Sequence, residues 1–264
     1  MKSPRIRLIQ SAVVDGDVAG NLDKALKTIA ACADEVDLVV FSETFIPGFP
    51  TPENVSRLAE PMDGPSISAV RKAAKNAGLS VAIGFAEVDD GRFFNTGVLI
   101  DANGEILHRY RKSHLYASDE GVFEPGIEFP VCDWHGIRLG MLICFDIEFP
   151  ETARMLAHHG AELIVVLDGM MKPYGHVHRA VIPVRAMENQ LYMVMANRVG
   201  VGDQYTFSGE SHVASPFGQT VSIAGSDDEA VVNVTLDMDD VRHAREEFRY
   251  VELSAIPLAG IPRH

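Results

Sequence analysis

The feature that most restricts the fold is the alternation of uninterrupted apolar runs with segments of helical periodicity. Leu38–Phe41 is one such run, and Leu163–Leu167 is another. Strands with this composition are buried on both faces, as in parallel sheets that helices cover on each side. Segments with helical spacing separate the runs in both halves of the chain, so the sequence predicts an α/β layered domain.

The predicted elements follow from this periodicity and from turn signals such as Asn103-Gly104. The expected strands are Ile6–Gln10, Asp37–Glu43, Leu79–Ala86, Phe93–Asp101, Glu105–Tyr110, Arg138–Ile143, Ala161–Leu167, Leu191–Asn197, Thr206–Ser215, Thr220–Ile223 and Glu229–Leu236. The expected helices are Val18–Cys32, Ile67–Ala77, Pro150–His159, Arg179–Asn189 and Asp239–Phe248. We expect residues 1–264 to form one domain, with an irregular tail over 250–264 that suits contact with a partner subunit.

Charge restricts the partners. The chain carries 37 acidic against 23 basic residues, a net charge of −14, which repels a phosphate backbone. No apolar run approaches the roughly 20 residues that cross a bilayer. Met1–Gln10 lacks the apolar centre of a secretory signal, so we expect a cytoplasmic protein without nucleic-acid or membrane partners.

The cysteines and histidines give no support for a disulfide framework or a metal site. Cys32, Cys132 and Cys144 are odd in number and form no C-x-x-C pair. His176 and His178 have no third ligand nearby in the sequence, and a partly exposed structural pair is the simpler interpretation. We therefore expect neither metal nor cofactor.

Cys144 has the setting of a nucleophile, because a buried strand gives way there to a helix. Exposed backbone N–H groups at such a turn can bind an oxyanion and favour a thiolate. The alternative is a small core residue, as an isolated cysteine often is. The base is left open by the residues alone: Glu43 and Lys112 lie at strand ends, and four histidines are also available, namely His114, His135, His158 and His212.

Three segments carry a family resemblance, and they are Phe41-Ser42-Glu43-Thr44-Phe45, Tyr110-Arg111-Lys112-Ser113-His114-Leu115 and Leu142-Ile143-Cys144-Phe145-Asp146. In content and order they resemble the signature segments of the nitrilase superfamily of carbon-nitrogen hydrolases, in its amidase and carbamoylase branches. Supporting matches extend from Ile6 to about Val234. The resemblance implies a four-layer αββα sandwich, a catalytic triad of Glu43, Lys112 and Cys144, and a homodimer or a higher homo-oligomer.

Two positions depart from the family pattern. Ser42 stands where proline usually precedes the glutamate. The family also has a structural glutamate seven or eight positions after the lysine, where this chain offers Asp119 and Glu120. We expect Glu120 to hold Lys112, with Asp119 as the alternative.

The resemblance implies an amidase that hydrolyses a small carboxamide to a carboxylic acid and ammonia through a thioester on Cys144, with the backbone N–H of Phe145 as an oxyanion donor. The alternatives are an N-carbamoyl amine or amino acid hydrolase, a nitrilase, and a catalytically silent binding module. Phe145-Asp146 stands where nitrile-cleaving members have Trp-Glu, which favours an amide substrate.

Two acidic residues bear on the substrate. Carbamoylases often hold a substrate carboxylate with arginines soon after the cysteine, but this chain has Glu148 there, and Asp168 stands where the family often has threonine or serine. We expect both acids to contact the acyl part of a neutral or basic amide. The alternative for Glu148 is a structural ion pair with Arg179 or Arg185.

Overall fold

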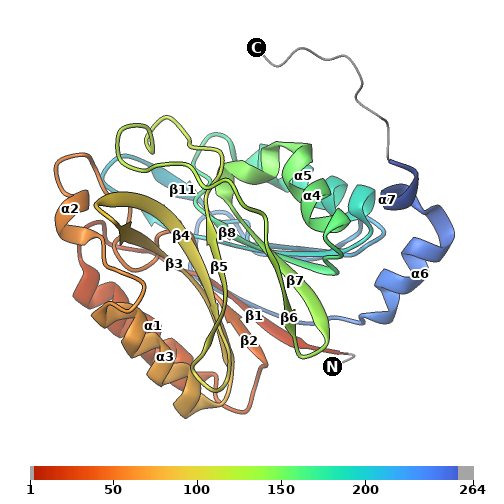
Figure 1. Cartoon of the computed structure of the whole chain (residues 1–264), viewed down its shortest axis with the longest axis horizontal. Helices are drawn as coiled ribbons and strands as arrows, with labels where there is room; N and C mark the ends of the chain where they lie inside the picture. Colours follow the sequence, from red (N-terminus) through yellow and green to blue (C-terminus); the bar gives the residue numbers. More distant parts are fainter. Residues whose placement is uncertain (1–2, 255–264) are drawn as a thin grey trace.

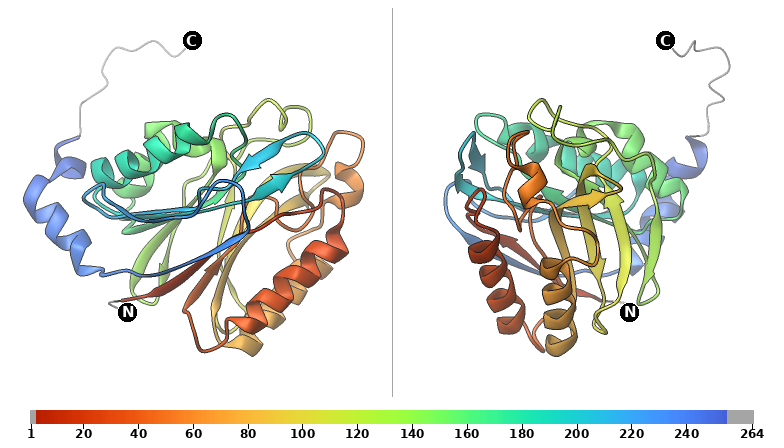
Figure 2. Two further views of the ribbon diagram at one scale, coloured as in Figure 1. Left: turned by 180° about the vertical axis from the view of Figure 1, so that it is seen from behind. Right: turned by 60° about the vertical axis from the view of Figure 1, so that its left-hand side comes forward.

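The computed structural model describes residues 3–254, in which two six-stranded sheets pack face to face. Helices α1 (Val18–Ala31) and α3 (Pro65–Ala77) cover the outer face of the first sheet, and α4 (Pro150–His158) and α5 (Gly175–Asn189) cover the outer face of the second (Figures 1 and 2). The four-layer αββα sandwich that the resemblance implies is therefore confirmed.

Each sheet is built around a β-α-β-α-β unit. In the first sheet the strand order is β14-β1-β2-β3-β4-β5, and β1, β2 and β3 run parallel. The strands are β1 (Arg5–Gln10), β2 (Leu38–Val40), β3 (Ser80–Asp89), β4 (Arg92–Ile100), β5 (Ile106–Arg111) and β14 (Ala230–Thr235). Because α1 and α3 connect the parallel strands, both helices lie on the same face.

The second sheet repeats this plan in the order β13-β12-β9-β8-β7-β6, with β7, β8 and β9 parallel. Its strands are β6 (Val131–Trp134), β7 (Ile137–Ile143), β8 (Leu163–Asp168), β9 (Tyr192–Asn197), β12 (His212–Ala214) and β13 (Thr220–Ile223). The smaller elements are α2 (Val55–Leu58), a 3₁₀ turn (Cys144–Glu148), the hairpin of β10 (Val199–Val201) and β11 (Thr206–Ser208), α6 (Asp239–Phe248) and α7 (Tyr250–Leu253).

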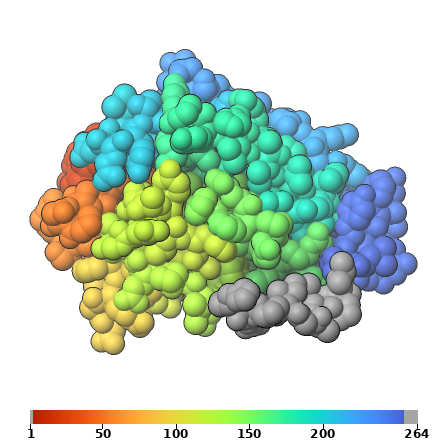
Figure 3. All heavy atoms as spheres, turned by 90° about the horizontal axis from the view of Figure 1, so that it is seen from above, coloured from red at the N-terminus to blue at the C-terminus, as the bar shows by residue number. Residues whose placement is uncertain are grey.

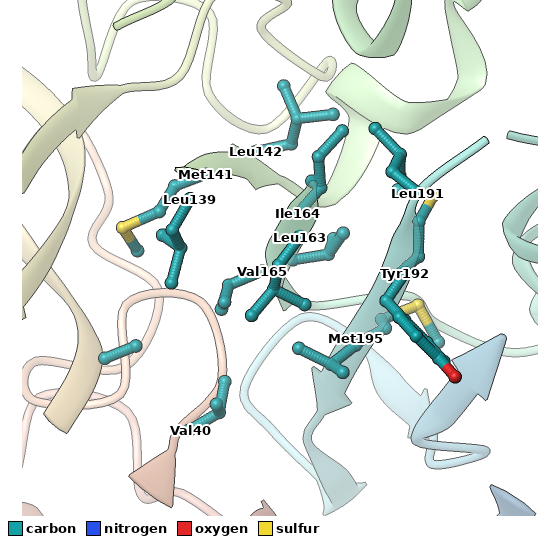
Figure 4. Packing of buried hydrophobic residues seen from close by; sticks show 14 of the residues in the cluster. Val40, Leu139, Met141, Leu142, Leu163, Ile164, Val165, Leu191, Tyr192 and Met195 are labelled. Carbon is teal, nitrogen blue, oxygen red and sulfur yellow. The ribbon is translucent and has the colours of Figure 1, made fainter. Parts of the chain in front are cut away.

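Apolar residues on both faces of the strands explain the layering. In β2, Leu38 and Val40 pack into the core between the sheets, whereas Val39 packs under α1 and α3. Figure 4 shows Val40 opposite the side chains of β7 and β8 in the core between the sheets. A strand with alternating polarity could not fill both layers, so the continuous apolar run is required.

The carboxyl ends of the parallel strands from both sheets meet at one place. The backbone N–H of Glu43, just after β2, donates to the carbonyl of Asp168 at the end of β8, at 3.2 Å. Cys144 directly follows β7, the neighbour of β8. Ligands of α/β sheets bind beyond such strand ends, and the fold places the three segments of the resemblance there.

The structure corrects the predictions for the strand Thr206–Ser215 and for the tail over 250–264. Thr206–Ser215 is interrupted at Gly209 and Glu210, both with φ of 58°, so β11 pairs with β10 and β12 joins the second sheet. β14, which corresponds to the predicted strand Glu229–Leu236, belongs to the first sheet and pairs with β1. Part of the expected irregular tail is the short helix α7, while residues 255–264 lie outside the described residues.

Within residues 3–254, no helix is both long and apolar enough to cross a bilayer.

Gly84 on β3 allows the close approach of the segment that carries Glu43. A Cβ at position 84 would lie 2.5 Å from the backbone nitrogen of Thr44 and 2.9 Å from the carbonyl oxygen of Ser42. We predict that Gly84→Ala lowers the free energy of unfolding by about 1–3 kcal/mol, measured by urea denaturation, because backbone atoms must move. Gly225→Ala is the matched control, since its Cβ meets no atom within 4 Å. Equal stability of the two variants would contradict this packing.

Candidate active site

Lys112 lies just after β5, and its ammonium group is held by two carboxylates. Nζ donates to Glu43 Oε1 at 2.7 Å and to Asp119 Oδ2 at 2.6 Å. The side chains of all three residues are at most 2% exposed. Burial alone would lower the pKa of Lys112, but Glu43 and Asp119 raise it well above its ordinary value. An ammonium has three N–H donors, so one is left for a ligand.

Glu43 has one carboxylate oxygen bound and one free. Oε1 accepts hydrogen bonds from Lys112 and from Asn95 Nδ2, the latter at 2.7 Å. Oε2 is buried without a hydrogen-bond partner among the described residues. Burial raises the pKa of Glu43, and the Lys112 ammonium opposes this shift. The free oxygen is therefore a proton acceptor of unusually high basicity for a glutamate.

Cys144 lies in a strained turn at the end of β7. Its φ is 43°, a value that costs a non-glycine residue about 1–3 kcal/mol. Burial raises the pKa of the Cys144 thiol well above its ordinary value, and Glu43 and Asp168 add to the shift, while Lys112 opposes it. The resting group is thus a thiol that needs a base.

Asp146 connects the Cys144 turn to the Lys112 loop. Its fully buried carboxylate accepts hydrogen bonds from the backbone N–H of Ile143 at 3.2 Å, from the Tyr110 hydroxyl at 2.8 Å and from the backbone N–H of His114 at 2.8 Å. These donors flank Cys144 and Lys112 in the sequence. Asp146 therefore fixes the distance between the two segments.

Glu43, Lys112 and Cys144 line one cavity of about 190 Å³. The other described lining residues, mostly aromatic or apolar, are Phe49, Tyr116, Ser118, Asp119, Phe145, Glu148, Gly169, Met170, Met171, Tyr174, Val177 and Tyr205. The segments near residues 50, 120, 145–175 and 205 that supply this wall adjoin one another on the face seen in Figure 3. The cavity thus combines the three reactive groups with a mostly apolar lining.

Asp119, and not Glu120, is the partner of Lys112. The prediction of Glu120 is wrong because Asp119 begins a tight turn, in which its carbonyl accepts from Val122 and Phe123 and its carboxylate accepts from the backbone N–H of Tyr116 at 3.0 Å. This turn aims Asp119 inward, and Glu120 is exposed.

Two of the three predicted substrate-contacting residues, Phe145 and Glu148, line the cavity. Asp168 is not among the described lining residues, and its expected contact with the substrate stays a prediction. It is fully buried, and its carboxylate accepts from its neighbour, the backbone N–H of Gly169, at 2.9 Å. The carboxylate of Glu148 contacts His178, whereas Arg185 donates to the backbone carbonyl of Glu148 at 3.0 Å. The alternative for Glu148, an ion pair with Arg179 or Arg185, is therefore not what the structure has.

The sequence reasoning missed the place of His178. The imidazole is 1% exposed, with Nδ1 at 3.0 Å from Asp168 and Nε2 at 3.3 Å from Glu148. Burial alone would lower the pKa of His178, but the two carboxylates raise it to about 9. Helix α5 begins at Gly175 instead of Arg179, which turns the expected surface histidine inward. No motif or spacing in the sequence indicated Asn95, which donates to Glu43.

Cys144, Asp168 and His178 offer three potential metal-ligand atoms within 4.8 Å of one another. Sulfur, carboxylate oxygen and imidazole nitrogen are all ligands of zinc. His178, however, has a carboxylate at each ring nitrogen, and a protonated imidazole has no lone pair for a metal ion. The geometry is that of a buried ion-pair chain.

The fold and this constellation define a carbon-nitrogen hydrolase, and comparison with known proteins agrees: the carbon-nitrogen hydrolase family model matches residues 5–246, so the chain belongs to that family. Over 257 residues it is 44% identical to an (R)-stereoselective amidase of a Pseudomonas species, covering 97% of this chain and 93% of that protein. A nitrilase of Pyrococcus abyssi is 36% identical over 85% of this chain and 86% of its own length. The crystal structure of an amidase from a Nesterenkonia species has a TM-score of 0.84 at 29% identity, covering 96% of this chain and 98% of that one.

The assignment of Asp119 predicts different effects of two neighbouring charge-removing substitutions. We expect Asp119→Asn to reduce kcat/KM for an amide by about 10²-fold, because a displaced Lys112 misaligns the site. It should also destabilise the fold by about 3–5 kcal/mol, the cost of breaking a buried ion pair. Glu120→Gln, which removes the same charge one residue away, is the control. Ammonia release measures the activity and thermal unfolding measures the stability. Equal losses of activity and stability in Asp119→Asn and Glu120→Gln would contradict the assignment.

Proposed function

We propose that this carbon-nitrogen hydrolase is an amidase, which hydrolyses a small carboxamide to a carboxylic acid and ammonia. The observation that carries the proposal is that Glu43, Lys112 and Cys144 line one small, mostly apolar cavity. The similarity to an (R)-stereoselective amidase and to an amidase of known structure supports the same reaction.

In the proposed first half-reaction, Glu43 takes the proton from the thiol while Cys144 Sγ attacks the amide carbon. The free oxygen of Glu43 suits this role, since its raised pKa matches it to a thiol whose pKa is also raised. The negative charge that develops on the carbonyl oxygen is stabilised by the remaining N–H of Lys112 and by the backbone N–H of Phe145. Glu43 then gives this proton to the amide nitrogen of the tetrahedral intermediate, the C–N bond breaks, and ammonia leaves as the thioester on Cys144 forms.

In the second half-reaction, Glu43 activates a water molecule that attacks the thioester carbon, and the acid is released with the thiol restored. Lys112 stabilises the oxyanion again. Asp119 acts as a positioning residue: it holds the Lys112 ammonium in place and takes no part in the proton transfers. One carboxylate therefore serves both halves, as general base and general acid in turn.

The lining of the cavity argues against an N-carbamoyl amino acid as the substrate. Such a substrate carries a carboxylate that needs a basic partner. Lys112 is the one basic side chain among the described lining residues, and two carboxylates already engage it. An amide without an acidic acyl group fits this lining better.

We also propose that two copies pair through α4 and α5 and that the protein works in the cytoplasm. Exposed apolar side chains on these helices support pairing, with Met155, Val184 and Met187 between 39% and 44% exposed. The three free cysteines are compatible with a reducing compartment.

The proposed chemistry predicts a thioester on Cys144 during turnover of a simple amide such as butyramide. Hydroxylamine should intercept it and give the hydroxamate, whereas Cys144→Ala should give neither hydroxamate nor ammonia. Glu43→Gln should reduce kcat by about 10²–10⁴-fold, the usual contribution of a general base. Ammonia release by Cys144→Ala at the wild-type rate would contradict the mechanism.

The raised pKa of Glu43 predicts the acid side of the pH profile. The reaction needs the deprotonated carboxylate, so kcat/KM should be full above the pKa of Glu43 and fall as pH drops through it. Because burial raises this pKa, the fall should occur above the ordinary glutamate value of about 4.3. A profile of kcat/KM against pH for a non-ionising amide checks it, and full activity down to the ordinary value would contradict the role of Glu43.

A further inference from the structure

We propose that Glu148 binds a protonated amine on the acyl part of the substrate, and that His178 is a positioning residue that holds Glu148 for this purpose. The inference rests on the proposed function, because it names the class of amide that the same site accepts. The substrate would be an amino amide whose ammonium lies close to the reacting carbonyl group.

Glu148 lies where it can reach the acyl group. Cys144 begins and Glu148 ends the same 3₁₀ turn, and both line the cavity. The other two carboxylates among the described lining residues, Glu43 and Asp119, are ion-paired with Lys112. The carboxylate of Glu148 is thus the one on the described wall that Lys112 does not neutralise, and it is 30% exposed.

The backbone and one carboxylate oxygen of Glu148 are held in place. Arg185 donates to the carbonyl oxygens of Ile147 and Glu148, both at 3.0 Å. His178 contacts Glu148 Oε1 at 3.3 Å, and the other side of its ring is fixed by Asp168 at 3.0 Å. The second carboxylate oxygen of Glu148 takes no part in this contact and is available to a ligand. Such a rigid carboxylate binds a cation with little loss of side-chain entropy.

The charges around His178 favour a cation. One imidazolium faces two carboxylates, Asp168 and Glu148, so negative charge remains in excess on this side of the cavity. The rings of Phe145, Tyr116, Tyr174 and Tyr205 line the same cavity, and aromatic faces attract ammonium groups. An acyl carboxylate would meet repulsion here, whereas an ammonium group would balance the excess negative charge.

The test compares pairs of amides of equal shape in which an ammonium group replaces a methyl group. Alaninamide is paired with isobutyramide, and β-alaninamide with butyramide, at about pH 7, where the amines are protonated. For the wild-type enzyme we expect a higher kcat/KM for the charged member of at least one pair. In Glu148→Gln, the ratio of charged to neutral kcat/KM should fall at least about tenfold, the loss expected for a charge-assisted hydrogen bond.

Glu151→Gln is the matched control, since it removes an exposed carboxylate three residues away and should leave the ratio unchanged. Two results would overturn the inference and leave the amidase proposal standing. One is a wild-type enzyme that hydrolyses the neutral amides but shows no preference for the charged ones. The other is a ratio of charged to neutral kcat/KM that Glu148→Gln does not alter. If no amide tested gives ammonia or hydroxamate, the amidase proposal itself is overturned.

The role of His178 is tested by coupling. His178→Gln should lower the same ratio, mainly through a higher KM for the charged amide, because Glu148 loses its hydrogen-bond donor. The double variant Glu148→Gln with His178→Gln should have no lower ratio than Glu148→Gln alone, since His178 acts through Glu148. Equal loss on charged and neutral amides, with additive effects in the double variant, would show a merely structural histidine; thermal unfolding confirms that each variant is folded.

Discussion

The site depends on one buried ammonium group shared between two carboxylates. Lys112 is paired with Glu43 and Asp119, and a buried ammonium without such partners would be strongly destabilising. The three residues come from the end of β2, the end of β5 and the loop that follows it, so the ion pairs also tie these segments together. A site of this kind is assembled only when the first sheet is complete.

The second constraint is the meeting of two sheets at their carboxyl ends. The backbone hydrogen bond from Glu43 to Asp168 joins the first sheet to the second, and the Asp146 carboxylate joins the Cys144 turn to the Lys112 loop. Nucleophile and base therefore belong to different sheets, and their separation is set by how the sheets pack. This explains why small residues such as Gly97 and Gly169 line the contact, since a Cβ at Gly97 would meet Leu167 and Met141 and one at Gly169 would meet Glu43.

Much of the fold could be predicted, because continuous apolar runs such as Leu163–Leu167 leave few alternatives to a covered sheet. The place of β14 could not, since a short alternating strand pairs equally well with either sheet on local grounds. Within the site, strand ends indicated Glu43, Lys112 and Cys144 as candidates, and the resemblance to the nitrilase superfamily predicted that they form a triad. The choice between Asp119 and Glu120 depends on the path of a loop, and the burial of His178 depends on a helix starting one turn early. Neither the path of the loop nor the start of the helix can be predicted from the local sequence pattern.

The pairing of β14 with β1 joins the two ends of the folded chain, with Arg5 opposite Thr235. During synthesis on the ribosome, the outer edge of β1 therefore has no partner until residues 230–235 have emerged. An open edge of that kind can pair with a foreign strand. Nascent chains of this protein are therefore more prone to such pairing than the folded protein is, and a chaperone or rapid translation of the last third would protect them.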